Sequence, residues 1–399
     1  MKSKPDFSRH SSEPLYLQAA HYLKERIADG TYPPSSVLPP EMELTSLLGV
    51  SRPTVRHALQ LLAEDGLVER EPGRGTFVTE TQRRPPYKRT GTLALVGPEM
   101  RDSFLMQITT GAEHIASQNN YHLILCNAGN QICNEQKYLM DLWEEKKVDG
   151  FLIMAADAPQ PHQTLSHLLQ AGAPMVFLDR YFDGLAAPFV VSDNHRGGYL
   201  LAKHLIDLGH RRIGFVTRPN LYVSSVAQRL QGYRQALEEA GLEYDSSLVF
   251  QGLLPYLSEV QVLEDSSPHL AEYDKAAIRE FLTRKNRPPA ILACNEVIAA
   301  QTMEVCRELN LRIPQDVAVV GYDDDIVAPL LAPPLTTVRQ QTREIGTRAA
   351  RMLLDILNGK PIEQQVFLPV QLIVRQSCGA DLQSIPHIYT KGGGENRLV

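Results

Sequence analysis

Four polar residues just after position 50 are of the types that contact nucleic acid. They are Ser51, Arg52, Thr54 and Arg56, and they stand where a helical pattern begins. An arginine guanidinium can donate two parallel hydrogen bonds to a guanine, with roughly 1–3 kcal/mol of discrimination against other bases. The N–H groups at a helix N-terminus also suit a phosphate. These residue types at this spacing therefore predict a contact with the major groove of DNA.

A second cluster of residues suited to DNA follows closely. Gly73, Arg74, Gly75 and Thr76 lie between two short strand-like runs, within the stretch LVEREPGRGTFV. Turn residues between two such runs predict a β-hairpin. The glycines allow a close approach of the backbone, and Arg74 at the tip can enter the adjacent minor groove.

Three helices are needed to hold these residues, and the sequence predicts all three. Apolar residues repeat along one face of residues 15–28, and a shorter helix at 41–48 ends at a glycine. Ser51 is suited to cap a third helix that stops near Gly66, with Pro53 in its first turn. This order, followed by a hairpin, predicts a winged helix-turn-helix. The alternative is a three-helix interaction domain whose arginines are solvated.

The complete pattern of residues 14–78 is more specific than the helix-turn-helix alone. It reads P-x-E-x-E-L, then L-G-V-S-R-P-T-V-R-x-A-L, then L-x-x-x-G-L-V and G-R-G-T-F-V. The stretch resembles the winged helix-turn-helix domain of the GntR family of bacterial regulators, which implies operator DNA as a partner. That family often has Ser and Arg where this chain has Pro40 and Met42. We expect the operator to be read differently, or less tightly, at the point where the arginine is missing.

After residue 91 the sequence alternates short apolar runs with helical stretches. Runs of about five apolar residues, bounded by turn residues, are typical of buried parallel strands joined by helices. The pattern predicts a doubly wound α/β architecture, and the length favours two similar subdomains. The runs are TLALVG (92–97), HLILC (122–126), GFLIMA (150–155), PMVFLD (174–179), FVVSD (189–193), RIGFV (212–216), AILAC (290–294) and VAVVGY (317–322).

Polar residues recur just beyond these runs, at the expected carboxyl ends of the strands. Asp179 and Arg180 follow one run, Asn295 follows another, and Asp323 follows the last. In open α/β sheets ligands bind beyond those ends. Carboxylate, amide and guanidinium groups suit a polyhydroxylated ligand, because each hydroxyl both donates and accepts. Phe104 offers an apolar face for a sugar ring.

Other interpretations stay open for two of these clusters. Asp179 and Arg180 could form a purely structural ion pair. The acidic run 323–325 could bind a metal, but no further ligands are suitably spaced, and we expect a solvated acidic turn. The sequence has no phosphate-binding loop, dinucleotide-binding glycine motif or nucleophile elbow. We therefore expect no enzyme activity, no cofactor and no metal.

Four segments of this part resemble the effector domain of the LacI/GalR family, over about residues 91–378. They are HRGGYLLAKHLIDLGHRRIGFV (195–216), RLQGYRQAL (229–237), ACNEVIAAQTMEVCRELNLRIPQDVAVVGYDD (293–324) and PPLTTVRQ (333–340). The resemblance implies a two-subdomain, periplasmic-binding-protein-like (type I) fold and a small-molecule effector, with a sugar expected. Glu296 stands where that family usually has aspartate. Matched motif by motif, the implied effector contacts are Phe104, Asp179, Arg180, Ser225, Arg229, Asn295, Asp323 and Gln340.

The distribution of charge agrees with two functional parts. The 399 residues carry a formal net charge of −6, which by itself gives no hint of nucleic acid. The first 90 residues hold 13 basic against 11 acidic residues, whereas the remainder holds 27 against 35. We expect a DNA-binding domain at 1–78 (core 14–78), a linker at 79–91, an effector domain at 92–380 and a disordered tail at 381–399.

Composition also limits where the protein acts. No run of about 18 apolar residues predicts a membrane span, and the N-terminus has no apolar segment typical of a secretory signal. Five scattered cysteines argue against a disulfide framework or a zinc site. We expect a cytoplasmic protein.

These observations together predict a bacterial transcriptional regulator, expected to be a repressor. It would bind operator DNA as a homodimer and respond to a sugar or related metabolite. Two alternatives stay open. One is a purine- or nucleoside-responsive regulator of the same fold, and the other is a cytoplasmic sugar-binding protein without DNA function.

Overall fold

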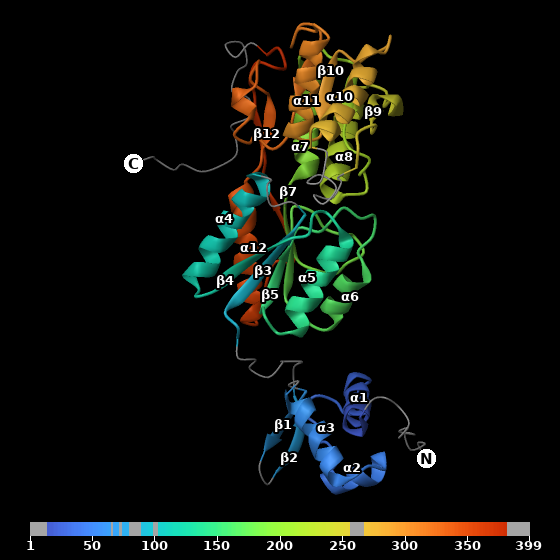
Figure 1. Ribbon diagram of the computed structural model, residues 1–399, viewed down its shortest axis with the longest axis vertical. Coiled ribbons are helices and arrows are strands. Elements are labelled where there is room, and N and C mark those ends of the chain that lie inside the picture. Colours follow the sequence, from blue (N-terminus) through green and yellow to red (C-terminus); the bar gives the residue numbers. More distant parts are fainter. Residues whose placement is uncertain are drawn as a thin grey trace. The chain divides into compact units, whose positions relative to one another are not determined.

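The structure is a computed structural model that describes residues 14–64, 67–71, 74–79, 89–98, 103–255 and 267–380. The chain divides into two compact units, residues 1–89 and residues 90–399 (Figure 1). Most of the expected linker, residues 80–88, and the expected tail, residues 381–399, lie outside the described residues.

The first unit, in its described residues, consists of three helices and a two-stranded sheet. The helices are α1 (Leu15–Ala28), α2 (Glu41–Leu48) and α3 (Arg52–Glu64). Strands β1 (Val68–Glu71) and β2 (Gly75–Val78) pair antiparallel, with Val68 opposite Val78. The predicted winged helix-turn-helix is confirmed.

Local sequence signals explain how α3 begins and what it buries. α2 ends at Gly49, whose φ of 67° lets the chain turn toward α3. The Ser51 hydroxyl then accepts a hydrogen bond from the backbone N–H of Thr54 at 3.4 Å, as a helix cap does. The inner face of α3 buries Val55 and Leu59, each at most 1% exposed. The outer face of the same helix is therefore available for DNA.

A six-stranded parallel sheet forms the first subdomain of the second unit (Figure 1). Its strand order is β13-β7-β6-β5-β3-β4. The strands are β3 (Thr92–Gly97), β4 (His122–Asn127), β5 (Gly150–Ile153), β6 (Met175–Leu178), β7 (Phe189–Ser192) and β13 (Gln365–Leu368). The helices that belong to it are α4 (Ser103–Gln118), α5 (Ile132–Glu144), α6 (Gln163–Gln170) and α12 (Thr342–Leu357).

A four-stranded parallel sheet, in the order β11-β10-β8-β9, forms the second subdomain. Its strands are β8 (Ile213–Val216), β9 (Val249–Phe250), β10 (Ala290–Ala293) and β11 (Ala318–Val320). Its helices are α7 (Asn194–Asp207), α8 (Ser224–Glu239), α10 (Ser267–Thr283) and α11 (Glu296–Glu308). Strands β12 (Thr337–Arg339) and β14 (Gln371–Ile373) form a separate antiparallel pair that packs beside α7.

The chain passes between the two subdomains more than once, so neither subdomain is one continuous stretch of sequence. The chain leaves the first sheet after β7, returns after β12 to add α12 and β13, and crosses again to β14. Several chain crossings therefore join the two subdomains.

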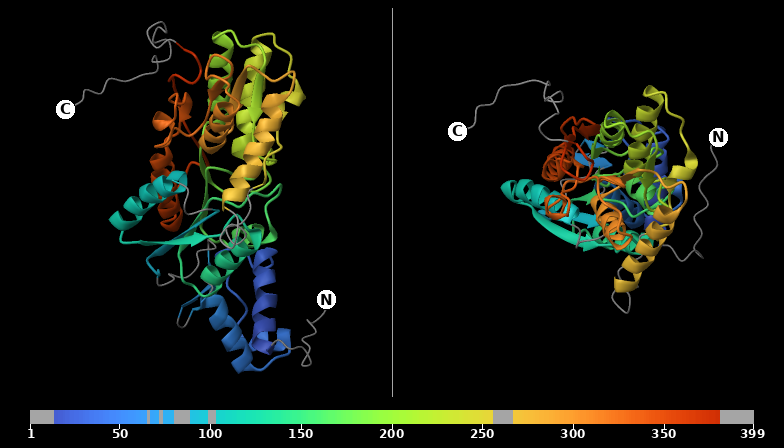
Figure 2. Two further views of the ribbon diagram at one scale, coloured as in Figure 1. Left: turned by 45° about the horizontal axis from the view of Figure 1, so that its top comes forward. Right: turned by 90° about the horizontal axis from the view of Figure 1, so that it is seen from above.

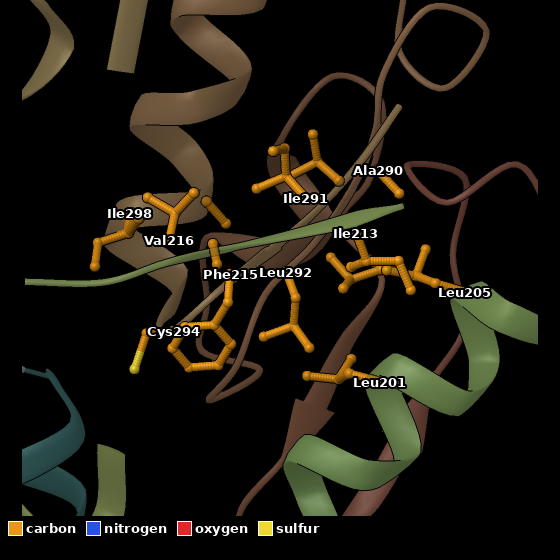
Figure 3. Packing of buried hydrophobic residues seen from close by; sticks show 14 of the residues in the cluster. Leu201, Leu205, Ile213, Phe215, Val216, Ala290, Ile291, Leu292, Cys294 and Ile298 are labelled. Atoms are coloured by element: carbon orange, nitrogen blue, oxygen red, sulfur yellow. The ribbon is translucent and has the colours of Figure 1, made fainter. Parts of the chain in front are cut away.

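Buried apolar side chains pack the helices against the sheets. In the second subdomain Leu201 and Leu205 of α7 pack toward Ile213, Phe215 and Leu292 of the sheet (Figure 3). All five side chains are at most 1% exposed. No helix in the part of the chain that the structure describes is both long enough and apolar enough to cross a lipid bilayer.

All eight predicted apolar runs contain strands, and the predicted two-subdomain, doubly wound fold is confirmed. One expectation needs correction, because β4 is an edge strand rather than a buried one. Ile124 and Leu125 on β4 are 38% and 43% exposed. Figure 2 shows β4 (cyan) lying beside α4, which agrees with the packing of these two elements.

Candidate DNA-binding and effector sites

The predicted DNA contacts gather at the start of α3. Ser51, Arg52 and Arg56 are exposed, and Thr54 is half-buried. The first two turns of α3 thus present two guanidiniums close to the N-terminal end of the helix. That combination can bind a phosphate and reach the edge of a base.

The wing places a second basic group at its tip. Arg74 and Gly75 are exposed and Thr76 is half-buried, whereas Gly73 lies outside the described residues. Gly75 has a φ of 133°, a conformation that L side chains rarely adopt, so the tight tip requires glycine. The guanidinium of Arg74 pairs with Glu71 and lies 5.8 Å from the centre of the Phe77 ring. Arg74 is therefore held close to the hairpin.

A cavity of about 1030 Å³ lies where strands of both sheets end. Residues that follow β5, β6, β8, β10 and β11 line it. The carboxyl ends of the two sheets thus share this space, where ligands bind in open α/β folds. The predicted effector contacts that line the cavity are Phe104, Asp179, Arg180, Ser225, Arg229, Asn295 and Asp323.

Arg229 is the most deeply held of the cavity's cations. Its side chain is 7% exposed, and its Nε donates to Asn194 Oδ1 at 2.8 Å. Its Nη1 donates to the carbonyl oxygen of Cys294 at 2.7 Å. The guanidinium also stacks 3.6 Å from the centre of the Tyr322 ring. These contacts fix the guanidinium before any ligand arrives, with Nη2 3.9 Å from Asp323 Oδ1.

Gln340 is the one predicted effector contact that does not line the cavity. Its side-chain amide donates to Asp323 Oδ1 at 2.7 Å, and the residue is 5% exposed. Gln340 thus orients the Asp323 carboxylate from outside the cavity lining. Burial raises the pKa of Asp323, against the opposing influence of Arg229.

Asp179 and Arg180 do form an ion pair, but they also belong to a wider network. Arg180 Nε lies 3.3 Å from Asp179 Oδ2, and Arg180 Nη1 pairs with Asp157. Asp157 Oδ2 in turn accepts a hydrogen bond from Asn220 Nδ2 at 3.1 Å. Since Asp157 follows β5 and Asn220 follows β8, this network joins the two subdomains across the cavity.

Sequence reasoning missed Asp157, Arg218 and Asn220, which all line the cavity. A usable signal was present, because Asp157 follows an apolar strand just as Asp179 does, and Arg218 and Asn220 follow β8. These three positions lie outside the segments that resemble the LacI/GalR family and two or more residues beyond an apolar run.

The acidic run 323–325 is not a solvated turn, and that expectation is wrong. Asp324 has a side chain only 3% exposed and binds Arg339 Nε and Arg375 Nη2, each at 2.6 Å. Asp325 accepts from Ser103 and from Gln107 Nε2, the latter at 3.3 Å, across to α4. Among the described residues no group of acidic, histidine or cysteine side chains is placed to hold a metal.

Glu296, the departure noted in the sequence, lies against this turn. One carboxylate oxygen accepts from the backbone N–H of Asp325 at 2.7 Å, and the residue is 6% exposed. Among the residues that the structure describes, the other oxygen has no hydrogen-bond partner. Burial raises the pKa of Glu296 to about 7, and the neighbouring carboxylates of Asp323 and Asp325 act in the same direction.

Comparisons with known proteins match both units of the chain. Residues 15–78 match the model of the bacterial regulatory proteins of the gntR family, and residues 202–378 match that of the periplasmic binding protein-like domain. The arabinose metabolism transcriptional repressor of Geobacillus stearothermophilus is 29% identical over 91% of this chain and 97% of that protein. The HTH-type transcriptional regulator CelR of Thermobifida fusca is 32% identical over 85% of this chain and 98% of that protein.

A solved structure extends the likeness to three dimensions. The complex of the transcriptional regulator CelR with cellobiose is 28% identical, with a TM-score of 0.63. It covers 85% of this chain and all of that one. In this chain a gntR-family domain precedes a periplasmic binding protein-like domain. The chain therefore belongs to the LacI/GalR-type bacterial transcriptional regulators, in the group whose DNA-binding domain is of the gntR family.

Proposed function

We propose that the effector is an uncharged polyhydroxylated molecule of the size of a mono- or disaccharide. The observation that carries this proposal is the charge balance of the cavity. Each of the arginines that line its described part is paired with a carboxylate, namely Arg180 with Asp157, Arg218 with Asp274, Arg229 with Asp323 and Arg307 with Glu304. A phosphate would have to displace these partners, whereas hydroxyls can join existing donors and acceptors.

Names of related regulators support the same class. Relatives of this chain are named for arabinose metabolism and the ribose operon, and the CelR structure contains cellobiose. A purine or nucleoside is the competing effector, because Arg229 and Asp323 would serve its polar edge equally well.

We further propose that the protein is a cytoplasmic repressor that binds DNA as a homodimer through the effector domains. Exposed apolar side chains support a self-contact, since large exposed apolar patches mark interaction surfaces. Gln107 on α4 contacts Asp325, and Asp325 contacts Glu296, so these segments are neighbours. The proposed dimer face comprises Met106, Ile124, Leu125, Val297, Ile326, Val327 and Leu330, which are 38–76% exposed, and Val297 and Val327 also line the cavity.

Effector binding would act on the contacts that cross the cavity. Asp157 with Asn220 and Asp325 with Ser103 join the subdomains in the arrangement seen here. A ligand that binds this arrangement more tightly than an open one shifts the equilibrium between them. A coupling of about 1–3 kcal/mol would change operator affinity roughly 5- to 150-fold.

The test is a thermal-shift screen over pentoses, hexoses, disaccharides, their phosphates and purines, followed by DNA titration at fixed salt. A neutral sugar should raise the melting temperature and change the affinity for a duplex that the protein itself selects. The Asp323→Asn variant should lose both responses and keep DNA binding. A response to phosphates or purines alone would refute the proposed effector class.

A further inference from the structure

Glu41 is the first glutamate of the P-x-E-x-E-L pattern, for which the sequence suggested no role, and it contacts three arginines of the DNA-binding unit. Arg52 Nε donates to it at 3.0 Å, and Arg70 Nη2 donates at 2.8 Å. Arg56 donates through both Nε and Nη2, each at 3.3 Å. Arg52 and Arg56 lie on α3 and Arg70 on β1, so one side chain joins the recognition helix to the wing.

The carboxylate of Glu41 is less exposed than the guanidiniums that it contacts. The Glu41 side chain is 21% exposed, whereas those of Arg52 and Arg56 are 60% and 59% exposed. The acceptor thus lies on the inner side of the cluster and the guanidiniums on its outer side. The bond to Arg52 uses Nε, and the two Nη groups of a guanidinium can together donate to a guanine.

We propose that Glu41 is a positioning residue for sequence-specific DNA recognition, because it orders Arg52, Arg56 and Arg70 before DNA is bound. The proposal rests on the DNA-binding function assigned to this unit. An exposed arginine loses side-chain freedom when it binds, and a partner that has already restricted it reduces that cost. Preorganisation matters most for base contacts, which need a defined geometry, and least for phosphate contacts, which tolerate many.

The charge of the cluster is compatible with this role. Three guanidiniums against one carboxylate leave a net positive charge that still attracts phosphates. Hydrogen bonds from Arg56 and Arg52 hold the pKa of Glu41 below its usual range, so the carboxylate stays ionised near neutral pH. The opposite role is an electrostatic brake, in which Glu41 merely repels DNA. The two roles predict opposite effects of neutralising the residue.

The experiment compares Glu41→Gln with Glu43→Gln in the full chain. Both residues lie in the first turn of α2, so each substitution removes one negative charge from the same helix end. Glu43 is exposed and has no arginine hydrogen bond among those of the described residues. The probes are a duplex that the wild-type chain enriches from a randomised pool and a scrambled duplex of the same composition.

For Glu41→Gln we expect the ratio of the two affinities to fall by about tenfold or more, the size of one well-formed arginine–guanine contact. Binding to the scrambled duplex should stay equal or rise, with an unchanged salt slope, because the three arginines remain. Glu43→Gln should keep the wild-type ratio. If the glutamine amide perturbs folding, as measured by circular dichroism, Glu41→Ala repeats the test.

An unchanged ratio in Glu41→Gln, or an equal gain for both duplexes, would overturn the positioning role and favour the brake. A wild-type chain that enriches no sequence from the pool would overturn the sequence-reading function itself, and this role with it. The two failures are therefore distinguishable.

Discussion

At the scale of single residues, Glu296 is the clearest point where burial works against ionisation. It is 6% exposed, and Asp323 and Asp325 lie nearby. One of its oxygens has no hydrogen-bond partner within the described part of the chain. Its pKa of about 7 in the folded chain exceeds the value of about 4.5 expected after unfolding. Between these two values the folded state binds the extra proton, so ionising Glu296 reduces stability as the pH rises.

We therefore predict that Glu296→Gln is more stable than the wild type at pH 8 but not at pH 4. The penalty removed should be on the order of 1–3 kcal/mol above pH 7 and should vanish below about pH 4.5. The glutamine oxygen can still accept from the Asp325 N–H. Melting temperature against pH measures the effect, and Glu243→Gln, at an exposed carboxylate, is the control. Equal stabilisation at both pH values would show that burial of the charge is not the cause.

Residue types were easier to predict from sequence than residue partners. The rule that ligands bind beyond the carboxyl ends of strands correctly placed Asp179, Asn295 and Asp323 at the cavity. The sequence could not show that Gln340 supports Asp323, or that Arg339 and Arg375 neutralise Asp324. These partners lie at or just after β12 and β14, and only the folded chain brings them to the acidic run.

At the scale of elements, each subdomain brings two helices into backbone contact through a pair of glycines. A Cβ on Gly111 of α4 would lie 2.0 Å from the Arg343 carbonyl oxygen, and one on Gly346 of α12 would lie 1.9 Å from that of Ile108. α7 and α8 use Gly198 and Gly232 in the same way, with distances of 2.0 Å to backbone oxygens. The same packing device thus recurs in both halves of the effector domain.

We predict that Gly346→Ala lowers stability by about 1–3 kcal/mol or more, because the added methyl must push α4 away from α12. Gly184→Ala is the matched control, since a Cβ there meets nothing within 4 Å. Melting temperatures of the two variants provide the measurement. A melting temperature of Gly346→Ala equal to that of the control would mean that the helices can separate without cost.

The sequence predicted the helices and strands that carry a clear apolar or periodic pattern. The long apolar runs predicted the strands, and the capped, periodic segments predicted α1, α2 and α3. β9, β12, β13 and β14 contain partly exposed or polar residues rather than a continuous buried apolar run, so no local pattern marked them. The edge position of β4 likewise depends on sheet order, which periodicity does not contain.

At the scale of the whole molecule, the net charge of −6 averages a slightly basic DNA-binding unit and an acidic effector domain. Within the described part of the unit, most of the exposed recognition arginines are already paired with acidic side chains. Bulk charge alone therefore contributes little to operator affinity. In the proposed homodimer the second DNA-binding unit would bind at a high effective concentration once the first is bound.

The double variant Ile326→Asp with Leu330→Asp tests that reasoning. These side chains are 73% and 76% exposed on the proposed dimer face, so charging them should leave the fold intact and prevent apolar contact between two copies. We expect a monomer in analytical ultracentrifugation and a loss of roughly 10²–10⁴-fold in affinity for the selected duplex. Leu208→Asp, at the C-terminal end of α7 and 37% exposed, should remain dimeric. A double variant that stays dimeric would place the self-contact on another surface, whereas a monomer with full DNA affinity would show that binding does not depend on dimerisation.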